Sequence, residues 1–185
     1  MDKYQFFKEL DEKVRKALED AGAIPGVETM GVLGCVNYKL FDPEGNLKQT
    51  GTNFNLVNSI GDRWLSHYAA GSTVGDPRSH WAELGVNTTA PVKGGTGLGT
   101  LITASSVAIS ASYPTRVDSF GTGTGEWTVW RYSWGAGVAT CGSIGEVGMR
   151  SQAGSFLAHA ICTPNVNKAA GDTLQVDWGW KFLGA

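Results

Sequence analysis

The sequence predicts a mainly β protein, and three of its features indicate this class. Short segments rich in aromatic and β-branched residues alternate with glycine turns over most of the second half. In the last segment, residues 174–182, hydrophobic residues alternate with polar residues or glycine, which is the period of a strand with one buried face. The 26 glycines and the low charged fraction of 17% favour turn-rich β structure over a helical bundle with a charged surface.

The predicted architecture is an antiparallel β-sandwich over residues 31–185, of jelly-roll or immunoglobulin-like kind. Many short strands with turn signals between them are typical of two packed antiparallel sheets. The length of 185 residues suits one such domain with an appendage. We expect the appendage to be residues 1–30, an N-terminal helical arm followed by a linker, and we expect one short helix inside the domain.

The first expected element is an amphipathic helix over residues 3–21. Apolar side chains recur along one side at spacings of three and four, and charged residues occupy the other positions. The apolar stripe that we expect to dock comprises Phe7, Leu10, Val14 and Leu18. A stripe of this kind has to be buried, either on the chain's own sandwich or on a partner. We predict a partner, because Pro25 and Gly26 can separate the helix from the sandwich.

A β-hairpin is expected next, over residues 31–57. Apolar and polar residues alternate over 36–40, and the segment DPEGN places proline and glycine where a turn needs them. A short helix should follow over residues 59–70, because Ser59 and Asp62 have the spacing of an N-terminal capping box. Both elements precede the main series of strands.

The remaining chain is expected to be an exposed loop and then a series of strands. Residues 71–78 are small and polar, which predicts the loop. The strands are expected at residues 81–86, 101–109, 113–120, 126–134, 138–141, 147–150, 156–162 and 174–182. Both sandwich topologies are compatible with this series.

No catalytic, cofactor or metal site is expected, so we predict that the chain is not an enzyme and needs no cofactor. The glycine-rich stretches at 93–100 and 121–125 lack the spacing of nucleotide-binding loops. The three histidines, His67, His80 and His159, have no metal-ligand spacing, and the chain contains no nucleophile elbow.

Two further sets of residues are expected to be structural. Cys35, Cys141 and Cys162 are odd in number and widely separated, so we expect reduced and mostly buried thiols. Glu146 stands between glycines in the otherwise apolar stretch GSIGEVGMRS. A carboxylate there can accept backbone N–H bonds in a turn, so a structural role is expected for Glu146 rather than a catalytic one.

The tryptophans raise an alternative hypothesis, a glycan-binding module. Trp130 and Trp134 fall on one face of the same predicted strand and could stack on sugar rings. Trp178 and Trp180 share a strand face with aliphatic residues, so we expect them in the core. The glycan hypothesis therefore depends on Trp130 and Trp134 being exposed.

Charge and hydropathy argue against other classes of partner. The formal net charge of -2 gives no global attraction to phosphate, so no nucleic-acid partner is expected. The apolar stretches are too short to span a membrane, and the first residues are acidic where a signal peptide would be apolar. We therefore expect no membrane partner and a soluble product of a cytoplasm.

The order of motifs along the chain is more specific than any one of them. A hairpin whose turn has the pattern D-x-x-G-x-L, here Asp42, Gly45 and Leu47, leads to the segment NLV and a short helix. The stretch HWAELGVNTTAP, a glycine-flanked turn at Glu146 and a closing pair of strands joined near Lys168 follow. This order resembles that of a group of small structural proteins of tailed bacteriophages.

The resemblance covers about residues 31–182 and implies a virion component without catalytic residues. Residues 1–30 depart from it and look like an added docking element. We therefore expect a capsid decoration or cement protein of a tailed-phage virion, assembled in the host cytoplasm, with a tail or fibre component as the alternative in the same class. Its partners would be capsid or tail subunits and copies of itself, because a part present in many copies assembles through complementary surfaces. A trimer is one form that the expected homo-oligomer could take.

Overall fold

The computed structural model describes residues 31–69, 80–121 and 123–183. The predicted arm, with its docking residues Phe7, Leu10, Val14 and Leu18, lies outside the described residues, and so does the predicted loop at 71–78. Residues Val32–Phe182 form a compact unit of their own, which is the subject of the description below.

The described residues contain nine strands and one helix. They are β1 (Gly31–Phe41), β2 (Leu47–Val57), α2 (Ser59–Ala69), β3 (Trp81–Gly85), β4 (Val107–Ala108), β5 (Thr115–Phe120), β6 (Gly123–Trp134), β7 (Cys141–Arg150), β8 (Phe156–Lys168) and β9 (Thr173–Leu183). The predicted hairpin is confirmed as β1 and β2, and the predicted short helix is confirmed as α2. The mainly β class is therefore confirmed.

All nine strands belong to one antiparallel sheet. Their order across it is β4-β3-β7-β8-β2-β1-β9-β6-β5. Neighbours in this order include strands far apart in the sequence, such as β2 with β8 and β6 with β9. A sandwich of two separate sheets is not confirmed, because hydrogen bonds connect the strands in a single series.

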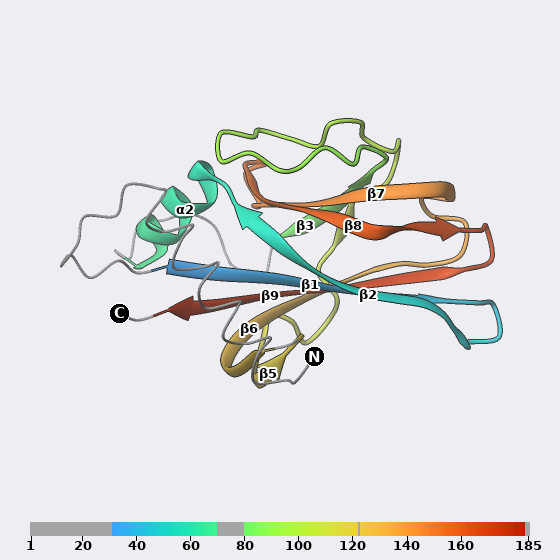
Figure 1. The fold of residues 1–185 in the computed structure, drawn as a ribbon, viewed down its shortest axis with the longest axis horizontal. Helices are drawn as coiled ribbons and strands as arrows, with labels where there is room; N and C mark the ends of the chain where they lie inside the picture. Colours follow the sequence, from blue (N-terminus) through green and yellow to red (C-terminus); the bar gives the residue numbers. More distant parts are fainter. Residues whose placement is uncertain (1–30, 70–79, 122, 184–185) are drawn as a thin grey trace, which may run out of the picture. The chain divides into compact units, whose positions relative to one another are not determined.

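The sheet curls until strands near its two ends come together. Ile109, just after β4, donates its backbone N–H to the carbonyl of His80 at 3.1 Å, before β3. Ile109 also forms a bridge with Tyr132 of β6, and the N–H of Ser110 reaches the carbonyl of Arg131 at 2.8 Å. Figure 1 shows β7 and β8 on one side of the curl, with β1, β9 and β6 on the other.

The inside of the curl holds the main hydrophobic core. Alternate side chains of β6 and β9 point into it, and the largest are Trp130, Tyr132, Trp134, Trp178 and Trp180. The prediction that Trp178 and Trp180 lie in the core is therefore confirmed. Phe182 continues their pattern but is 48% exposed, because it lies near the end of its strand.

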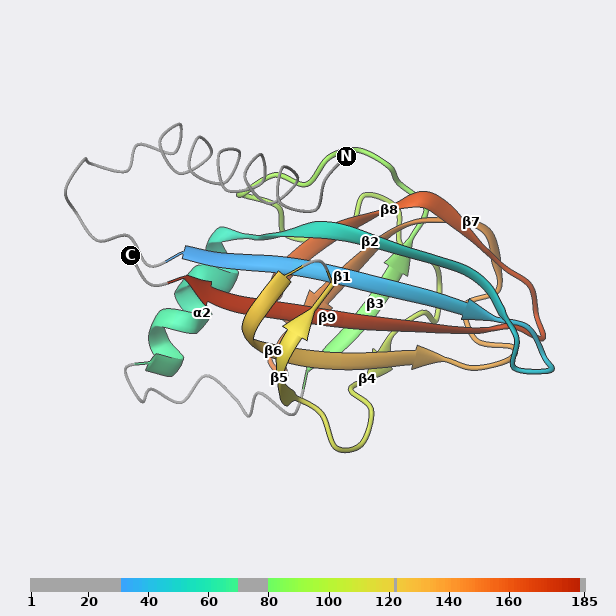
Figure 2. The ribbon, with the colours of Figure 1, turned by 60° about the horizontal axis from the view of Figure 1, so that its bottom comes forward.

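A cycle of four aromatic rings attaches α2 to this core. Trp64 of α2 contacts His80 and Trp180, with ring centroids 4.9 and 6.5 Å apart. Trp130 completes the cycle, stacking on His80 at 6.0 Å and meeting Trp180 edge-on at 5.0 Å. Figure 2 shows α2 near one end of β1 and β9.

A second, smaller cluster lies on the outer side of the sheet, where side chains of β5 pack over it. Cys35, Trp127 and Val129 are buried there. Phe120 of β5 packs against Trp127 with ring centroids 5.7 Å apart. It also lies directly over Gly179, where any Cβ would overlap the phenyl ring. Glycine at this position of β9 therefore allows close packing.

Two predicted strands are wrong over most of their length. Of residues 101–109, only Val107–Ala108 are a strand. The hydroxyl of Ser105 accepts a bond from the N–H of Leu84 at 3.0 Å and donates one to its carbonyl at 3.1 Å, so a side chain replaces the strand ladder. Residues 138–140 belong to the connection between β6 and β7, residues 135–140, in which Gly137 and Ala139 have positive φ angles of 77° and 50°.

Candidate functional site

The long connection between β3 and β4, residues 86–106, is the most unusual part of the described chain. It contains no helix or strand and passes over the outer side of β7 and β8 (Figure 1). Loops of this length without regular structure are uncommon in compact domains and are usually functional. We refer to residues 86–106 as the pinned loop, because several side chains fix its backbone to the sheet.

Glu146 of β7 is the main anchor of the pinned loop. A register shift between Ile144 and Glu146 interrupts the pairing of β7 with β8. The carboxylate is fully buried and accepts backbone N–H bonds from Asn87 at 3.2 Å, Gly99 at 3.1 Å and Thr100 at 3.0 Å. The predicted bonds to backbone N–H groups are confirmed, although Glu146 lies in a strand and its donors lie in the pinned loop.

Glycines surround Glu146 on both the loop and the strands. A Cβ at Gly85 would overlap the Glu146 carboxylate, and a Cβ at Gly99 would overlap the Asn87 amide. At Gly145 a Cβ would lie 2.6 Å from the Asn87 carbonyl oxygen. These glycines therefore let the backbone approach the carboxylate closely enough for hydrogen bonding.

His159 of β8 lies beside the same carboxylate. Its Nε2 is 2.9 Å from Oε2 of Glu146, and its ring meets Phe156 edge-on at 5.8 Å. Burial lowers the pKa of His159 below its usual range, and the nearby carboxylate of Glu146 offsets only part of this effect. The imidazole is therefore neutral at pH 7.

The other part of the pinned loop is fixed near the start of α2. Lys93 donates from Nζ to the Val57 carbonyl at 2.8 Å and forms an ion pair with Asp62. The carbonyl of Lys93 accepts the N–H of Ser59 at 2.8 Å. Asn58 donates from Nδ2 to the carbonyl of Gly95 at 3.0 Å. The pinned loop is thus held at two separate places.

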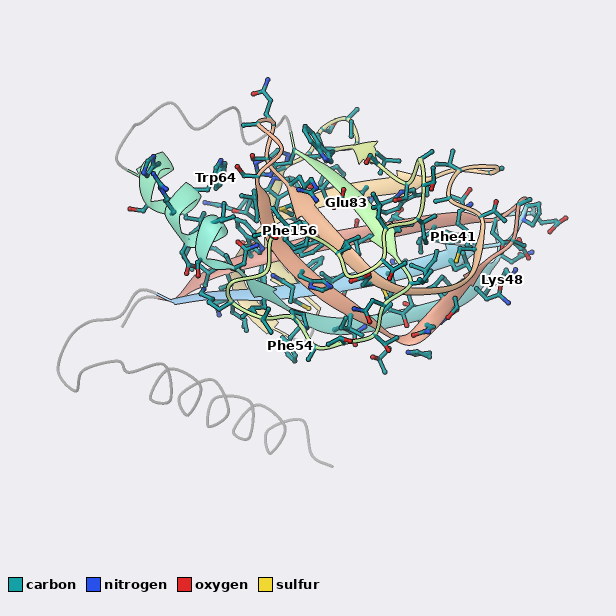
Figure 3. All side chains as sticks on the ribbon, turned by 90° about the horizontal axis from the view of Figure 1, so that it is seen from above. Phe41, Lys48, Phe54, Trp64, Glu83 and Phe156 are labelled. Atoms are coloured by element: carbon teal, nitrogen blue, oxygen red, sulfur yellow. The ribbon has the colours of Figure 1, made fainter. Side chains whose placement is uncertain are left out.

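A third polar contact lies on the same outer side of the sheet. Arg150 of β7 pairs with buried Glu83 of β3, with Nε and Oε1 2.8 Å apart. The guanidinium also lies over the ring of Phe156, 5.1 Å from its centroid. Figure 3 looks onto this side, with Glu83 and Phe156 labelled. The chain below the pinned loop is therefore packed and paired.

The pinned loop exposes three larger aliphatic side chains and carries little charge. Val86, Val92 and Leu101 are 38%, 66% and 53% exposed. Between Glu83 and Arg116, Lys93 is the one charged side chain in the sequence. Depletion of charge together with exposed apolar groups is typical of the centre of a protein interface. This stretch with a single charged residue is the sequence signal that could have indicated the surface.

The ionisable groups at this site are buried or hydrogen-bonded. The carboxylate of Glu146 is occupied by three backbone donors and His159. Within the described parts of the chain, no three His, Cys, Asp or Glu side chains form a group suited to a metal ion. The three cysteines are free thiols, and burial raises the pKa of Cys35 and Cys162 to about 12, which leaves both protonated at neutral pH.

The predicted glycan contacts need correction. Trp130 and Trp134 do share one face of a strand, but that face is the inner one, and the two side chains are only 3% and 0% exposed. Trp130 packs in the aromatic cycle, and Trp134 donates from Nε1 to the Ser105 carbonyl. Neither indole is available to a sugar at the surface.

Comparisons with known proteins add no family. A scan of family models, a search of curated proteins and a search of solved structures each gave no match to this chain. None of the helices that the structure describes is long and apolar enough to cross a membrane. The functional argument therefore depends on the sequence and on the site itself.

Proposed function

We propose that the chain is a structural component of a tailed-phage virion that decorates or cements the capsid. The observation that carries this proposal is the use of the buried carboxylate of Glu146. The carboxylate oxygens accept backbone N–H bonds that hold the pinned loop, and the loop exposes apolar side chains. A rigid surface of this kind suits a protein that works by assembling with others.

Other buried charges in the described residues also hold loops and turns. Lys168 donates from Nζ to the carbonyl of Gly135 at 2.9 Å, across the turn between β6 and β7. Asp172 pairs with Lys48 at 2.7 Å and accepts the N–H of Ala169 at 2.9 Å. The Lys168 bond fixes the turn between β6 and β7, and the Asp172 bonds fix the turn between β8 and β9. They support a scaffold role, because each charge has a structural partner.

The order of motifs supports the virion assignment in particular. The hairpin turn at Asp42 is closed by its carboxylate, which accepts the backbone N–H of Asn46 at 2.7 Å. The glycine-flanked Glu146 is the anchor of the pinned loop. Both features belong to the resemblance to small structural proteins of tailed phages, so the motifs that carry it have clear structural roles.

The alternative of a glycan-binding module loses the two residues on which it depended. Trp130 and Trp134 are buried, and their indoles pack against other core side chains. A tail or fibre component stays within the proposed class, and the same experiment addresses it.

Co-sedimentation tests the proposed function. The purified full chain is mixed with purified virions of the phage whose genome encodes it, and also with virions stripped of their surface proteins. We expect the chain to pellet with the stripped particles and saturate at a fixed ratio to the capsid subunit. A chain that stays in the supernatant with both preparations would contradict the proposal, and pelleting with isolated tails alone would favour the tail component.

A further inference from the structure

We propose that the free edge of β5 (Thr115–Phe120) pairs with β5 of a second copy of this chain. The two strands run antiparallel about a twofold axis at Val117, so that the two sheets become continuous. This pairing is a property of the chain beyond the proposed function and does not depend on it. The position, the geometry and the charges of β5 select the partner and the register.

β5 is the last strand at one end of the sheet. Within the described chain it pairs with β6 and with no other strand, so alternate backbone N–H and C=O groups face away from the sheet. Figure 1 shows β5 at the lower margin of the ribbon, next to β6. At the other end, β4 is only two residues long, and Ile109 after it forms a bridge with Tyr132. An unpaired edge like that of β5 is a template for a strand of another chain.

β5 keeps a regular strand geometry along this edge. Its register with β6 shifts after Val117, but the extra residue belongs to β6, where Gly125 and Glu126 both lie opposite Asp118. Val117 packs against the outer cluster around Trp127, whereas Asp118 is exposed. The edge can therefore accept a partner strand without rearrangement of β5.

The sequence of β5 is complementary to itself. In antiparallel pairing about Val117, Arg116 of each copy lies opposite Asp118 of the other, and Thr115 lies opposite Ser119. Opposite charges and pairs of hydroxyl side chains at directly opposite positions stabilise antiparallel strands, whereas like charges destabilise them. Moving the axis to Arg116 or to Asp118 places like charges opposite each other. The charges thus select a second copy as the partner and a single register.

Both charges are available to a partner. The side chain of Arg116 is 70% exposed, and its contact with Glu126, with Nη1 and Oε1 3.2 Å apart, leaves other N–H donors of the guanidinium unused. Asp118 is exposed and forms no ion pair with another described side chain. Pairing with a second copy therefore supplies Asp118 with a cation that its own chain does not provide.

Sedimentation equilibrium of the full chain tests this pairing with two charge variants, Arg116→Asp and Asp118→Arg. Concentrations up to about 0.1 mM cover micromolar dissociation constants. Each variant alone places like charges opposite each other, but a one-to-one mixture of the two places opposite charges at both contacts. Lys39→Asp is the matched control, because it changes the net charge as Arg116→Asp does, at an exposed position of β1. Circular dichroism and thermal unfolding establish that each variant is folded.

The expected result is a self-associating wild type whose dissociation constant rises about tenfold in each variant alone, because the twofold axis doubles every change. The one-to-one mixture should associate about as tightly as the wild type, and Lys39→Asp should leave association unchanged.

Four results overturn the proposal. They are a wild type that stays monomeric throughout, a folded variant that associates as tightly as the wild type, a mixture that does not recover association, and an equal loss in Lys39→Asp. Virions play no part in these measurements. Failure of this pairing therefore leaves the proposed function standing, and failure of co-sedimentation leaves this pairing standing.

Discussion

Glu146 and His159 lie side by side on the outer side of β7 and β8, with Oε2 and Nε2 2.9 Å apart. The same carboxylate extends beyond this pair to three backbone N–H groups of the pinned loop. A single buried side chain therefore joins two strands to one part of the pinned loop, while Lys93 and Asn58 hold another part. The predictions below follow from this arrangement and from the packing around it.

Replacing Glu146 with alanine should destabilise the protein by about 3 kcal/mol, because the substitution leaves buried N–H donors without an acceptor. Urea unfolding followed by tryptophan fluorescence measures the change. Glu126→Ala is the control: it removes a carboxylate from an exposed ion pair with Arg116 and should change stability little. Equal effects of the two substitutions would contradict the role given to Glu146.

His159 should make stability fall in mildly acidic solution. Its pKa in the folded protein is lowered by burial, whereas in the unfolded chain it is about 6.5. The unfolded state therefore binds the proton first, and the free energy of unfolding decreases from about pH 6.5 down to the lower pKa of the folded state. Urea unfolding between pH 5 and 8 measures this slope.

His159→Gln should reduce that slope, because it removes the titrating group. His67→Gln removes an exposed histidine of α2 but keeps His159, so it should preserve the slope of the wild type. A variant lacking His159 that keeps the full slope would show that other groups cause it.

Trp178→Ala should lower the free energy of unfolding by about 3 to 5 kcal/mol, since the indole is fully buried in the main core. Phe182→Ala, four residues further along β9, should cost about 1 kcal/mol or less because its ring is half-exposed. Thermal and urea unfolding compare the two. If Trp178→Ala unfolds like the wild type, the core assignment is wrong.

Deleting residues 1–22 tests the predicted docking role of Phe7, Leu10, Val14 and Leu18. Residues Val32–Phe182 form a compact unit with its own core, so the truncated chain should fold and stay soluble. Loss of virion binding in this folded protein would support docking through the arm. Unfolding or aggregation would contradict an independent arm, and undiminished binding would place the docking surface elsewhere.

Local patterns predicted the local elements of this fold. The turn segment DPEGN and the alternation around Tyr38 predicted β1 and β2, and the capping residues Ser59 and Asp62 predicted α2. These features depend on neighbours in the sequence. Alternation also grouped Trp130 with Trp134 correctly, but it could not say which face is inside, and a strand turned over exposes the opposite set of side chains.

The non-local features could not be predicted in the same way. The donors to Glu146 at Gly99 and Thr100 lie 47 and 46 residues away in sequence, so the glycines around Glu146 indicated hydrogen bonding without identifying the donors. The curl brings Ile109 to Tyr132 through an isolated bridge. No repeating sequence pattern marks a bridge of this kind. Ser105 ended a predicted strand through bonds to Leu84, which sequence alone does not pair with it.

Hydrogen exchange at three backbone amides tests the central claim most directly, the claim that Glu146 fixes the pinned loop. In the wild type, the amides of Asn87, Gly99 and Thr100 should exchange slowly by NMR, because each donates to the buried carboxylate. In folded Glu146→Ala these three should exchange fast while the core amides of β9 stay slow. Rates typical of an unfolded chain at all three amides of the wild type would contradict the account.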